Sequence, residues 1–123
     1  MANVLIVDDE PAILGVLSRI IMREGHTVTA AASGLEALEV LEAQNVDLAF
    51  VDLLMPEMDG IELMGRVGTE YLGVKLVPMS SLANLWSLPS EYATEPSLAK
   101  PFALEDVQAV LAKALEKEEP GTQ

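Results

Sequence analysis

Cysteine is absent from the 123-residue sequence. Disulfide scaffolds, zinc ribbons, iron–sulfur clusters and thiol catalysis all depend on cysteine, so the sequence excludes these classes of protein. Internal repeats and low-complexity segments are lacking too. Hydrophobic residues make up 50% of the chain and charged residues 22%, which excludes a disordered or fibrous protein. A chain of this length and composition is expected to fold as one compact domain.

Basic residues are scarce. Seven lysines and arginines stand against twenty aspartates and glutamates, which gives a net charge of −13. This charge repels phosphate groups and anionic lipids, so we expect no direct binding of nucleic acid and no binding to membranes. Basic proteins and metal cations are the expected partners.

Long apolar runs are missing as well. The first run, residues 4–7, stops at Asp8 and has no basic residue before it, so it lacks the pattern of a signal peptide. No segment approaches the roughly 18 consecutive apolar residues of a transmembrane helix. We therefore expect a soluble protein of the cytoplasm.

Short apolar runs alternate with helical patterns along the chain. Runs that are apolar at every position are typical of strands covered by helices on both faces. The alternation predicts an α/β fold with a parallel sheet. The runs lie at residues 4–7, 28–32, 48–51 and 74–77.

The helices between these runs have recognisable starts and ends. Pro11 and Gly25 mark the ends of a first helix over residues 11–24. Ser33 and Asp59 are the expected N-caps of the next two helices.

The pattern is weakest after the fourth run. Pro89 and Pro96 interrupt the helix that begins at Leu82, so the fourth helix is expected to be short or irregular. Pro78 lies inside the fourth run, where its missing N–H should remove one hydrogen bond of the sheet.

An apolar stripe over residues 104–115 predicts a C-terminal helix. The residues after it are mostly charged or small and polar. We therefore place the domain at residues 1–117, followed by a solvated tail or the start of a linker at residues 118–123.

Three acidic residues directly follow strands of the predicted sheet. Asp8 and Asp9 come after the first run and Asp52 comes after the third. The carboxyl ends of parallel strands lie at one edge of a sheet, so these carboxylates are expected to converge. Clustered carboxylates repel one another, and Mg²⁺, which prefers oxygen ligands, would relieve that repulsion. Taken singly, Asp8 or Asp9 fits a turn residue or a helix cap equally well.

Four sequence elements carry a resemblance to a known family. They are VLIVDDEP at residues 4–11, VDLLMPEMDGIEL at 51–63, Ser80 after the fourth run, and AKPF at 99–102. In order and approximate spacing they resemble the receiver domain of two-component response regulators, of the kind found in chemotaxis regulators. The resemblance implies a doubly wound, flavodoxin-like fold with five parallel strands in the order 2-1-3-4-5 and five flanking helices.

The resemblance also implies roles in phosphoryl transfer. Asp52 resembles the aspartate that takes a phosphoryl group from a phosphohistidine, Ser80 the switch hydroxyl, and Lys100 the lysine that pairs with the phosphoryl oxygens. The implied donor is a sensor histidine kinase or a phosphotransfer domain, and the implied target is a downstream protein or a C-terminal output domain. We expect no enzyme activity beyond self-phosphorylation and slow autodephosphorylation.

A Mg²⁺ site belongs to the same resemblance. Asp9 resembles a direct carboxylate ligand beside Asp52, Asp8 acts largely through water, and the backbone carbonyl of Leu54 is a further ligand. Three ionised carboxylates contribute −3, which Mg²⁺ and Lys100 together offset.

Three positions depart from the family pattern. Ser97 stands where receivers usually carry Tyr or Phe, and Leu54 and Leu82 stand where polar side chains often act on the hydrolytic water. Slow loss of the phosphoryl group is therefore expected. One alternative is a degenerate receiver that binds a protein constitutively, independent of phosphorylation. A haloacid-dehalogenase-like phosphatase is disfavoured, because Leu54 occupies the place of its second aspartate.

Three kinds of residue are interpreted as structural. Trp86, the single tryptophan, is expected to pack against the sheet or a neighbouring helix, with a binding anchor as the alternative. His26 is expected to be a solvated turn residue. The six methionines are expected to fill the core rather than to bind a soft metal.

Overall fold

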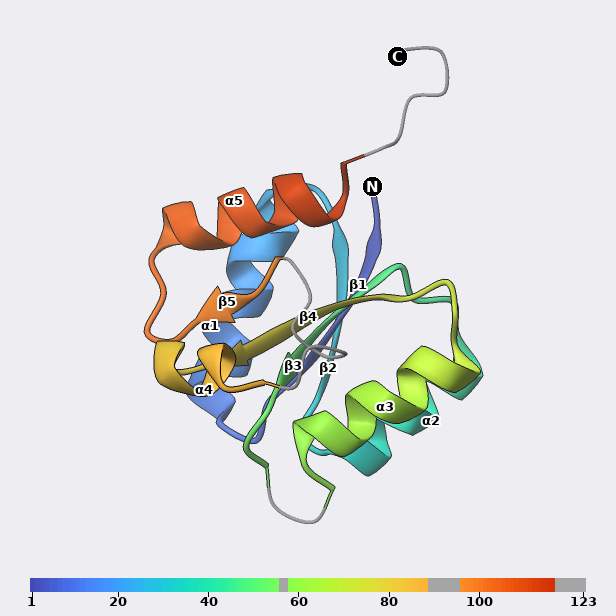
Figure 1. Ribbon diagram of the computed structural model, residues 1–123. Helices are drawn as coiled ribbons and strands as arrows, with labels where there is room; N and C mark the ends of the chain where they lie inside the picture. The colour runs from blue at the N-terminus through green and yellow to red at the C-terminus, as the bar shows by residue number, and fades with distance from the viewer. Residues whose placement is uncertain (56–57, 89–95, 117–123) are drawn as a thin grey trace, which may run out of the picture.

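The computed structural model describes residues 1–55, 58–88 and 96–116 (Figure 1). The strands are β1 (Asn3–Val7), β2 (Thr27–Ala31), β3 (Leu48–Asp52), β4 (Lys75–Ser80) and β5 (Leu98–Ala99). The helices are α1 (Pro11–Arg23), α2 (Gly34–Ala43), α3 (Gly60–Glu70), α4 (Leu82–Trp86) and α5 (Leu104–Ala114). Within these described ranges, no helix combines the length and apolarity needed to cross a membrane. The expected tail at 118–123 lies outside the described residues.

The five strands form one parallel sheet in the order β2-β1-β3-β4-β5. This confirms the α/β fold predicted from the alternating runs and the strand order implied by the resemblance. β1 and β3 are neighbours, with Val7 of β1 opposite Val51 of β3. The segments after these two strands therefore leave the sheet side by side at its carboxyl edge.

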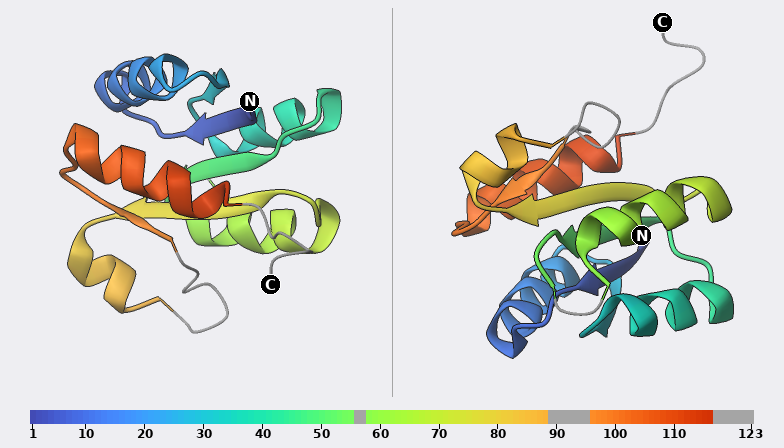
Figure 2. Two further views of the ribbon diagram at one scale, coloured as in Figure 1. Left: turned by 90° about the horizontal axis from the view of Figure 1, so that it is seen from above. Right: turned by 60° about the horizontal axis from the view of Figure 1, so that its bottom comes forward.

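Helices cover both faces of the sheet, and each face has its own hydrophobic cluster (Figure 2). Helices α1 and α5 pack on one face, and α2 and α3 pack on the other. Along β3, Leu48 and Phe50 face the first pair of helices, and Ala49 and Val51 face the second. All five residues of β3 are buried. This double covering explains why the strand sequences are apolar at successive positions.

The predicted helix boundaries have the expected chemistry. The Ser33 hydroxyl accepts the N–H of Glu36 at 3.1 Å, and the Asp59 carboxylate accepts the N–H of Glu62 at 2.8 Å. Both side chains therefore cap their helices, α2 and α3. Gly25 follows α1 with a φ of +96°, a left-handed conformation that suits glycine and ends the helix there.

Pro78 lies within β4, and the prediction that it removes a sheet hydrogen bond was wrong. Alternate residues along a parallel strand bond to opposite neighbours. The carbonyl of Met79 accepts the N–H of Leu53 on the β3 side, so the nitrogen of Pro78 faces the β5 side. There β5 begins only at Leu98, which pairs with Met79. The missing N–H therefore lies ahead of the paired segment.

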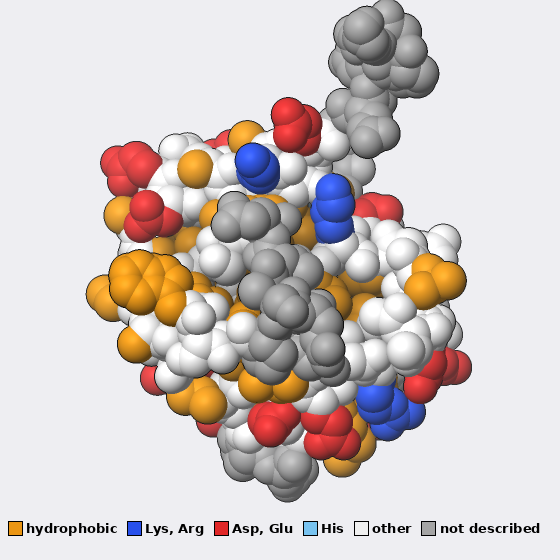
Figure 3. Space-filling model, viewed as in Figure 1, with side chains coloured by type: hydrophobic (Ala, Val, Ile, Leu, Met, Phe, Trp, Pro, Cys, Tyr) orange, Lys and Arg blue, Asp and Glu red, His pale blue; other side chains and the backbone are white. Residues whose placement is uncertain are grey.

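Helix α4 has five residues, so the prediction of a short fourth helix is confirmed. The prediction that Trp86 packs inward was wrong, because its side chain is 79% exposed. Leu85 takes the inward position, and the next residue on a helix points about 100° away. Hydrophobic side chains gather on the surface over α4, where Leu82 is also exposed (Figure 3).

His26 also differs from its expectation. It is partly buried, and its Nδ1 accepts the N–H of Ala2 at 3.0 Å, so it ties the start of the chain to the turn before β2. The methionines mostly follow their expectation as core residues. The buried ones are Met55, Met58, Met64 and Met79, and the exposed ones are Met1 and Met22.

Candidate functional site

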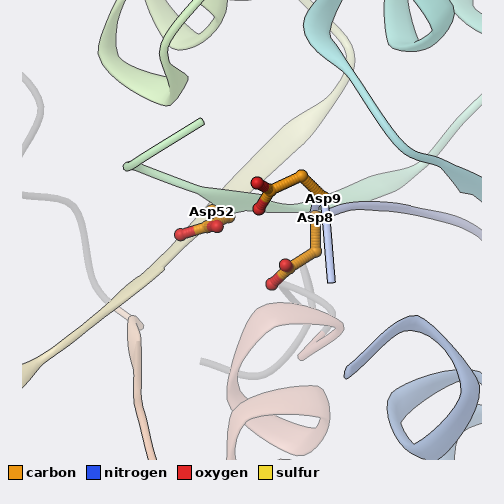
Figure 4. A group of neighbouring side chains, drawn as sticks. All are labelled: Asp8, Asp9 and Asp52. Carbon is orange, nitrogen blue, oxygen red and sulfur yellow. The ribbon is translucent and has the colours of Figure 1, made fainter. Parts of the chain in front are cut away.

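Three aspartates come together at the carboxyl edge of the sheet. Asp52 is the last residue of β3, and Asp8 and Asp9 directly follow the neighbouring β1. Carboxylate oxygens of all three lie within 4.8 Å of one another (Figure 4). Strand adjacency therefore unites acids that are more than forty positions apart in the sequence.

Lys100 joins this cluster from the end of β5, the edge strand of the sheet. It directly follows β5, and its Nζ donates to Oδ2 of Asp8 at 2.6 Å. The same Nζ lies 3.6 Å from carboxylate oxygens of both Asp52 and Glu10. Asp8 is 0% exposed, and its Oδ1 accepts the N–H of Glu10 at 2.9 Å. Both oxygens of Asp8 are thus engaged within the protein.

The surroundings shift the protonation of two groups. Burial raises the pKa of the Asp52 carboxyl, and the charge of Asp8 raises it further. The N–H of Leu54, 3.3 Å from Asp52 Oδ1, and the charge of Lys100 act in the opposite direction. Burial alone would lower the pKa of Lys100, but its hydrogen bond to Asp8 and the nearby carboxylates outweigh burial and raise that pKa.

The donor set fits a divalent cation. The three aspartates contribute −3 and Lys100 contributes +1, which leaves −2 when all four are ionised. Hard divalent cations prefer oxygen ligands, and two positive charges would balance this cluster. Asp9 is exposed, whereas Asp8 is fully buried, so the two adjacent acids are differently placed to offer an oxygen to a metal.

The backbone around Asp52 is tightly held. The N–H of Leu53 donates to the carbonyl of Met79 on β4 at 3.0 Å, and the N–H of Gly60 donates to the carbonyl of Leu53 at 3.1 Å. A Cβ at Gly60 would come within 2.1 Å of the Asp52 carbonyl oxygen. Only glycine therefore lets α3 start so close to β3. This packing fixes the position from which the Asp52 side chain projects.

Ser80 ends β4 and is 3% exposed. Its carbonyl accepts the N–H of Lys100 at 2.8 Å, and its hydroxyl oxygen accepts the side-chain amide of Asn84 at 3.0 Å. Neither Asn84 nor Glu10 was identified from the sequence. The spacing could have pointed to Asn84, because it lies four residues after Ser80, which is one helical turn along when a helix begins there.

Asp52, Ser80, Asn84 and Lys100 line a common cleft of about 370 Å³, together with Asp9. The sequence-predicted residues Asp9, Asp52, Ser80 and Lys100 therefore share one space. Asp8 lies beneath it, bonded to Lys100.

The three departures from the family pattern occupy different places. Leu54 lines the cleft, with its side chain 65% exposed. Leu82 lies at the start of α4 and is 49% exposed. Ser97 lines a separate hollow beside β5 and α5. Of the three, Leu54 is the one that the structure places beside Asp52.

Residues 4–112 match the family model of the response regulator receiver domain. The chain belongs to this family. The match runs from β1 into α5, and it confirms the resemblance carried by the four sequence elements. The acidic cluster of this receiver domain resembles the phosphorylation site of two-component response regulators.

Curated relatives differ in how much of their length the chain covers. It is 30% identical over 115 residues to sporulation initiation phosphotransferase F of Bacillus subtilis, covering 92% of this chain and 93% of that protein. It is 32% identical over 126 residues to the transcriptional regulatory protein GlrR of Escherichia coli, covering 98% of this chain but 28% of that protein. It is 36% identical over 123 residues to the sensor kinase CckA of Brucella abortus, covering 96% of this chain and 13% of that protein.

Solved structures share the fold. The response regulator TrrA of Thermotoga maritima, in complex with Mg²⁺ and BeF, is 29% identical with a TM-score of 0.84, covering 94% of this chain and 100% of that one. The receiver domain of NtrX from Brucella abortus is 25% identical with a TM-score of 0.85, covering 94% and 99%. Both agree with the five-stranded receiver fold described above.

Proposed function

We propose that this receiver domain accepts a phosphoryl group on Asp52 from a phosphorylated histidine of a sensor kinase or phosphotransfer domain. The observation that carries the proposal is the placement of the Asp52 carboxylate in a cleft that it shares with Lys100 and Ser80. An ionised carboxylate needs no general base to act as a nucleophile. The intact set of acids, hydroxyl and lysine gives no support to the degenerate, constitutive alternative.

The transfer exchanges one bond for another. An oxygen of Asp52 forms a bond to phosphorus while the bond from phosphorus to the histidine nitrogen breaks, and that nitrogen keeps the electron pair and is protonated from solvent. Lys100, 3.6 Å from Asp52, would pair with the phosphoryl oxygens. Ser80 would turn its hydroxyl toward the same oxygens. The domain acts on itself and turns over no separate substrate.

Mg²⁺ is the cation that we propose for this site. Asp9, Asp52 and the backbone carbonyl of Leu54 would hold it directly. Asp8 would act through water, because both of its oxygens already accept hydrogen bonds within the protein. When bound, the ion supplies charge that offsets the carboxylates and the incoming phosphoryl group. Lys100 pairs with Asp8, the residue that precedes Asp9.

The output of the domain belongs to the same proposal. Phosphorylation of Asp52 would shift the conformation of the domain and so regulate a downstream protein or an output domain beyond residue 117. The similarity to a segment of the transcriptional regulator GlrR supports an attached output domain. The similarity over 93% of sporulation initiation phosphotransferase F supports a separate downstream protein. We propose that this takes place in the cytoplasm.

Labelling with acetyl phosphate, with and without Mg²⁺, tests the proposal. Intact mass should increase by one phosphoryl group only when Mg²⁺ is present, and Asp52→Asn should abolish the increase because it removes the nucleophile. Asp59→Asn is the matched control, since asparagine caps α3 as well as aspartate does. Phosphate retained on Asp52→Asn, or a wild type that is never labelled, would refute the assignment.

A further inference from the structure

The hydroxyl of Ser80 already has a partner that the phosphorylation chemistry does not use. Asn84 donates its side-chain amide to Ser80 Oγ at 3.0 Å. Ser80 is buried at the end of β4, and Asn84 lies on the first turn of α4. A hydroxyl held by this bond points toward α4.

The position of Asn84 is itself fixed. The Ser81 hydroxyl accepts the backbone N–H of Asn84 at 3.2 Å and caps α4. The carbonyl of Ser80 is bonded to the N–H of Lys100 at 2.8 Å. With the backbone held on both sides, rotation of the Ser80 side chain is the movement that remains available. Its hydroxyl then has two places to go, the amide of Asn84 or the space above Asp52.

We propose that Asn84 is a positioning residue that acts as a latch on Ser80. In the resting protein the amide holds the Ser80 hydroxyl at α4, and the phosphoryl group on Asp52 must break this bond to recruit the hydroxyl. The bond to Asn84 thereby increases the free energy that is needed to move the Ser80 hydroxyl toward Asp52. This inference rests on the proposed function of Asp52, and Asn84 itself touches no reacting atom.

The size of the effect follows from the setting of the bond. Ser80 is buried but Asn84 is exposed, so water competes for the amide. A hydrogen bond of this kind shifts an equilibrium by about two- to tenfold. Loss of the latch should therefore strengthen binding of a phosphoryl mimic by about two- to tenfold, because less of the binding free energy is spent on freeing the hydroxyl.

Beryllofluoride, which stands in for the phosphoryl group, tests the latch without a chemical step. Its affinity in the presence of Mg²⁺ is measured by NMR titration for wild type, Asn84→Ala, Ser80→Ala and the double variant. Asn84→Ala should bind about two- to tenfold more tightly, and the substitution should change nothing when Ser80 is already alanine. Alanine favours a helix, so α4 is retained. Ser87→Ala, which removes another side-chain bond of the same region, is the control and should match wild type.

The outcomes separate the latch from the function on which it rests. Unchanged or weaker binding by Asn84→Ala overturns the latch, since weaker binding would mean that Asn84 assists the bound state. An equal gain in the Ser80→Ala background overturns it too, because Asn84 would then act through α4 alone. A wild type that neither binds beryllofluoride nor is labelled by acetyl phosphate refutes the proposed function, and the latch falls with it.

Discussion

The ammonium of Lys100 holds together acids that come from different strands. Asp8 is completely buried, so a substitution that removes the ammonium leaves its carboxylate without a counter-charge. We expect Lys100→Met to lower the free energy of unfolding by about 3 kcal/mol in the absence of divalent cations. Urea unfolding at neutral pH measures this. Lys75→Met, at an exposed position of β4, should change it by less than about 0.5 kcal/mol, and equal losses would contradict the role of Lys100.

The ion pair between Lys100 and Asp8 predicts a dependence of stability on pH. The pKa of Lys100 is raised above 10.5, so the folded protein binds this proton more tightly than the unfolded chain does. The stabilisation is therefore complete below pH 10.5 and is lost as the pH rises through the raised pKa. The difference in unfolding free energy between wild type and Lys100→Met should shrink over that alkaline range. A constant difference would show that the lysine stabilises by packing instead of charge.

Leu54 is expected to control the lifetime of the acyl phosphate. Its side chain lines the cleft beside Asp52 and offers no hydrogen bond to an attacking water. Hydrolysis should therefore be slow, and faster when Leu54→Asn and Leu82→Glu are combined. Because Leu54 lies in the cleft and Leu82 is exposed on α4, most of the acceleration should come from Leu54→Asn alone. The rate of phosphate release after removal of the donor measures the hydrolysis. A double variant that is no faster than wild type would contradict the control of hydrolysis by these leucines.

The start of α3 depends on one glycine. A Cβ at Gly60 would lie 2.1 Å from the Asp52 carbonyl oxygen and 2.5 Å from the Leu53 Cα, both of which are backbone atoms and cannot turn aside. Gly60→Ala should therefore destabilise the domain by about 1–3 kcal/mol or more and slow its labelling. Gly68, later in α3, has open space around it, so Gly68→Ala should stabilise the helix by up to about 1 kcal/mol. Thermal unfolding of both variants measures the two changes in stability. Similar changes for Gly60→Ala and Gly68→Ala would contradict the special role of Gly60.

Helix ends were predictable where a side chain acts locally. Ser33, Asp59 and Gly25 satisfy or redirect the backbone within a few residues, so their effect can be inferred without knowing the rest of the fold. Trp86 could not be placed this way. Its exposure depends on which face of α4 packs inward. That face is set by Leu85, which packs against residues distant in sequence. The two residues of β5 are likewise recognisable only through their pairing with β4.

The candidate site also has one part that could be predicted from the sequence and one that could not. The convergence of Asp8, Asp9 and Asp52 could be predicted because parallel strands bring their carboxyl ends to one edge. The contact between Asn84 and Ser80 could not, because it requires α4 to begin at one particular residue after β4. A shift of one position would turn the amide about 100° away from the hydroxyl.

The charge of the whole molecule leads us to expect that its stability depends on Mg²⁺. At a net charge of −13, a bound divalent cation relieves repulsion that the folded state concentrates at the carboxyl edge. Mg²⁺ at a hundredfold over its Kd should add about 2.7 kcal/mol to the free energy of unfolding. Asp9→Ala should lose more of this gain than Asp8→Ala, since both oxygens of Asp8 are engaged elsewhere. Calorimetric melting with and without Mg²⁺ measures each gain, and equal losses would contradict the ranking.

The sheet divides the hydrophobic interior into two clusters that share only the strands. We therefore expect substitutions in α1 or α5 to be accommodated among their own neighbours without repacking α2 and α3. A change in the surface on one side of the molecule is therefore expected to leave the packing on the other side in place. The carboxyl edge is the common boundary of both sides, because β3 is buried from each face and ends in Asp52. We therefore expect the surface over either pair of helices to tolerate substitutions without displacing Asp52.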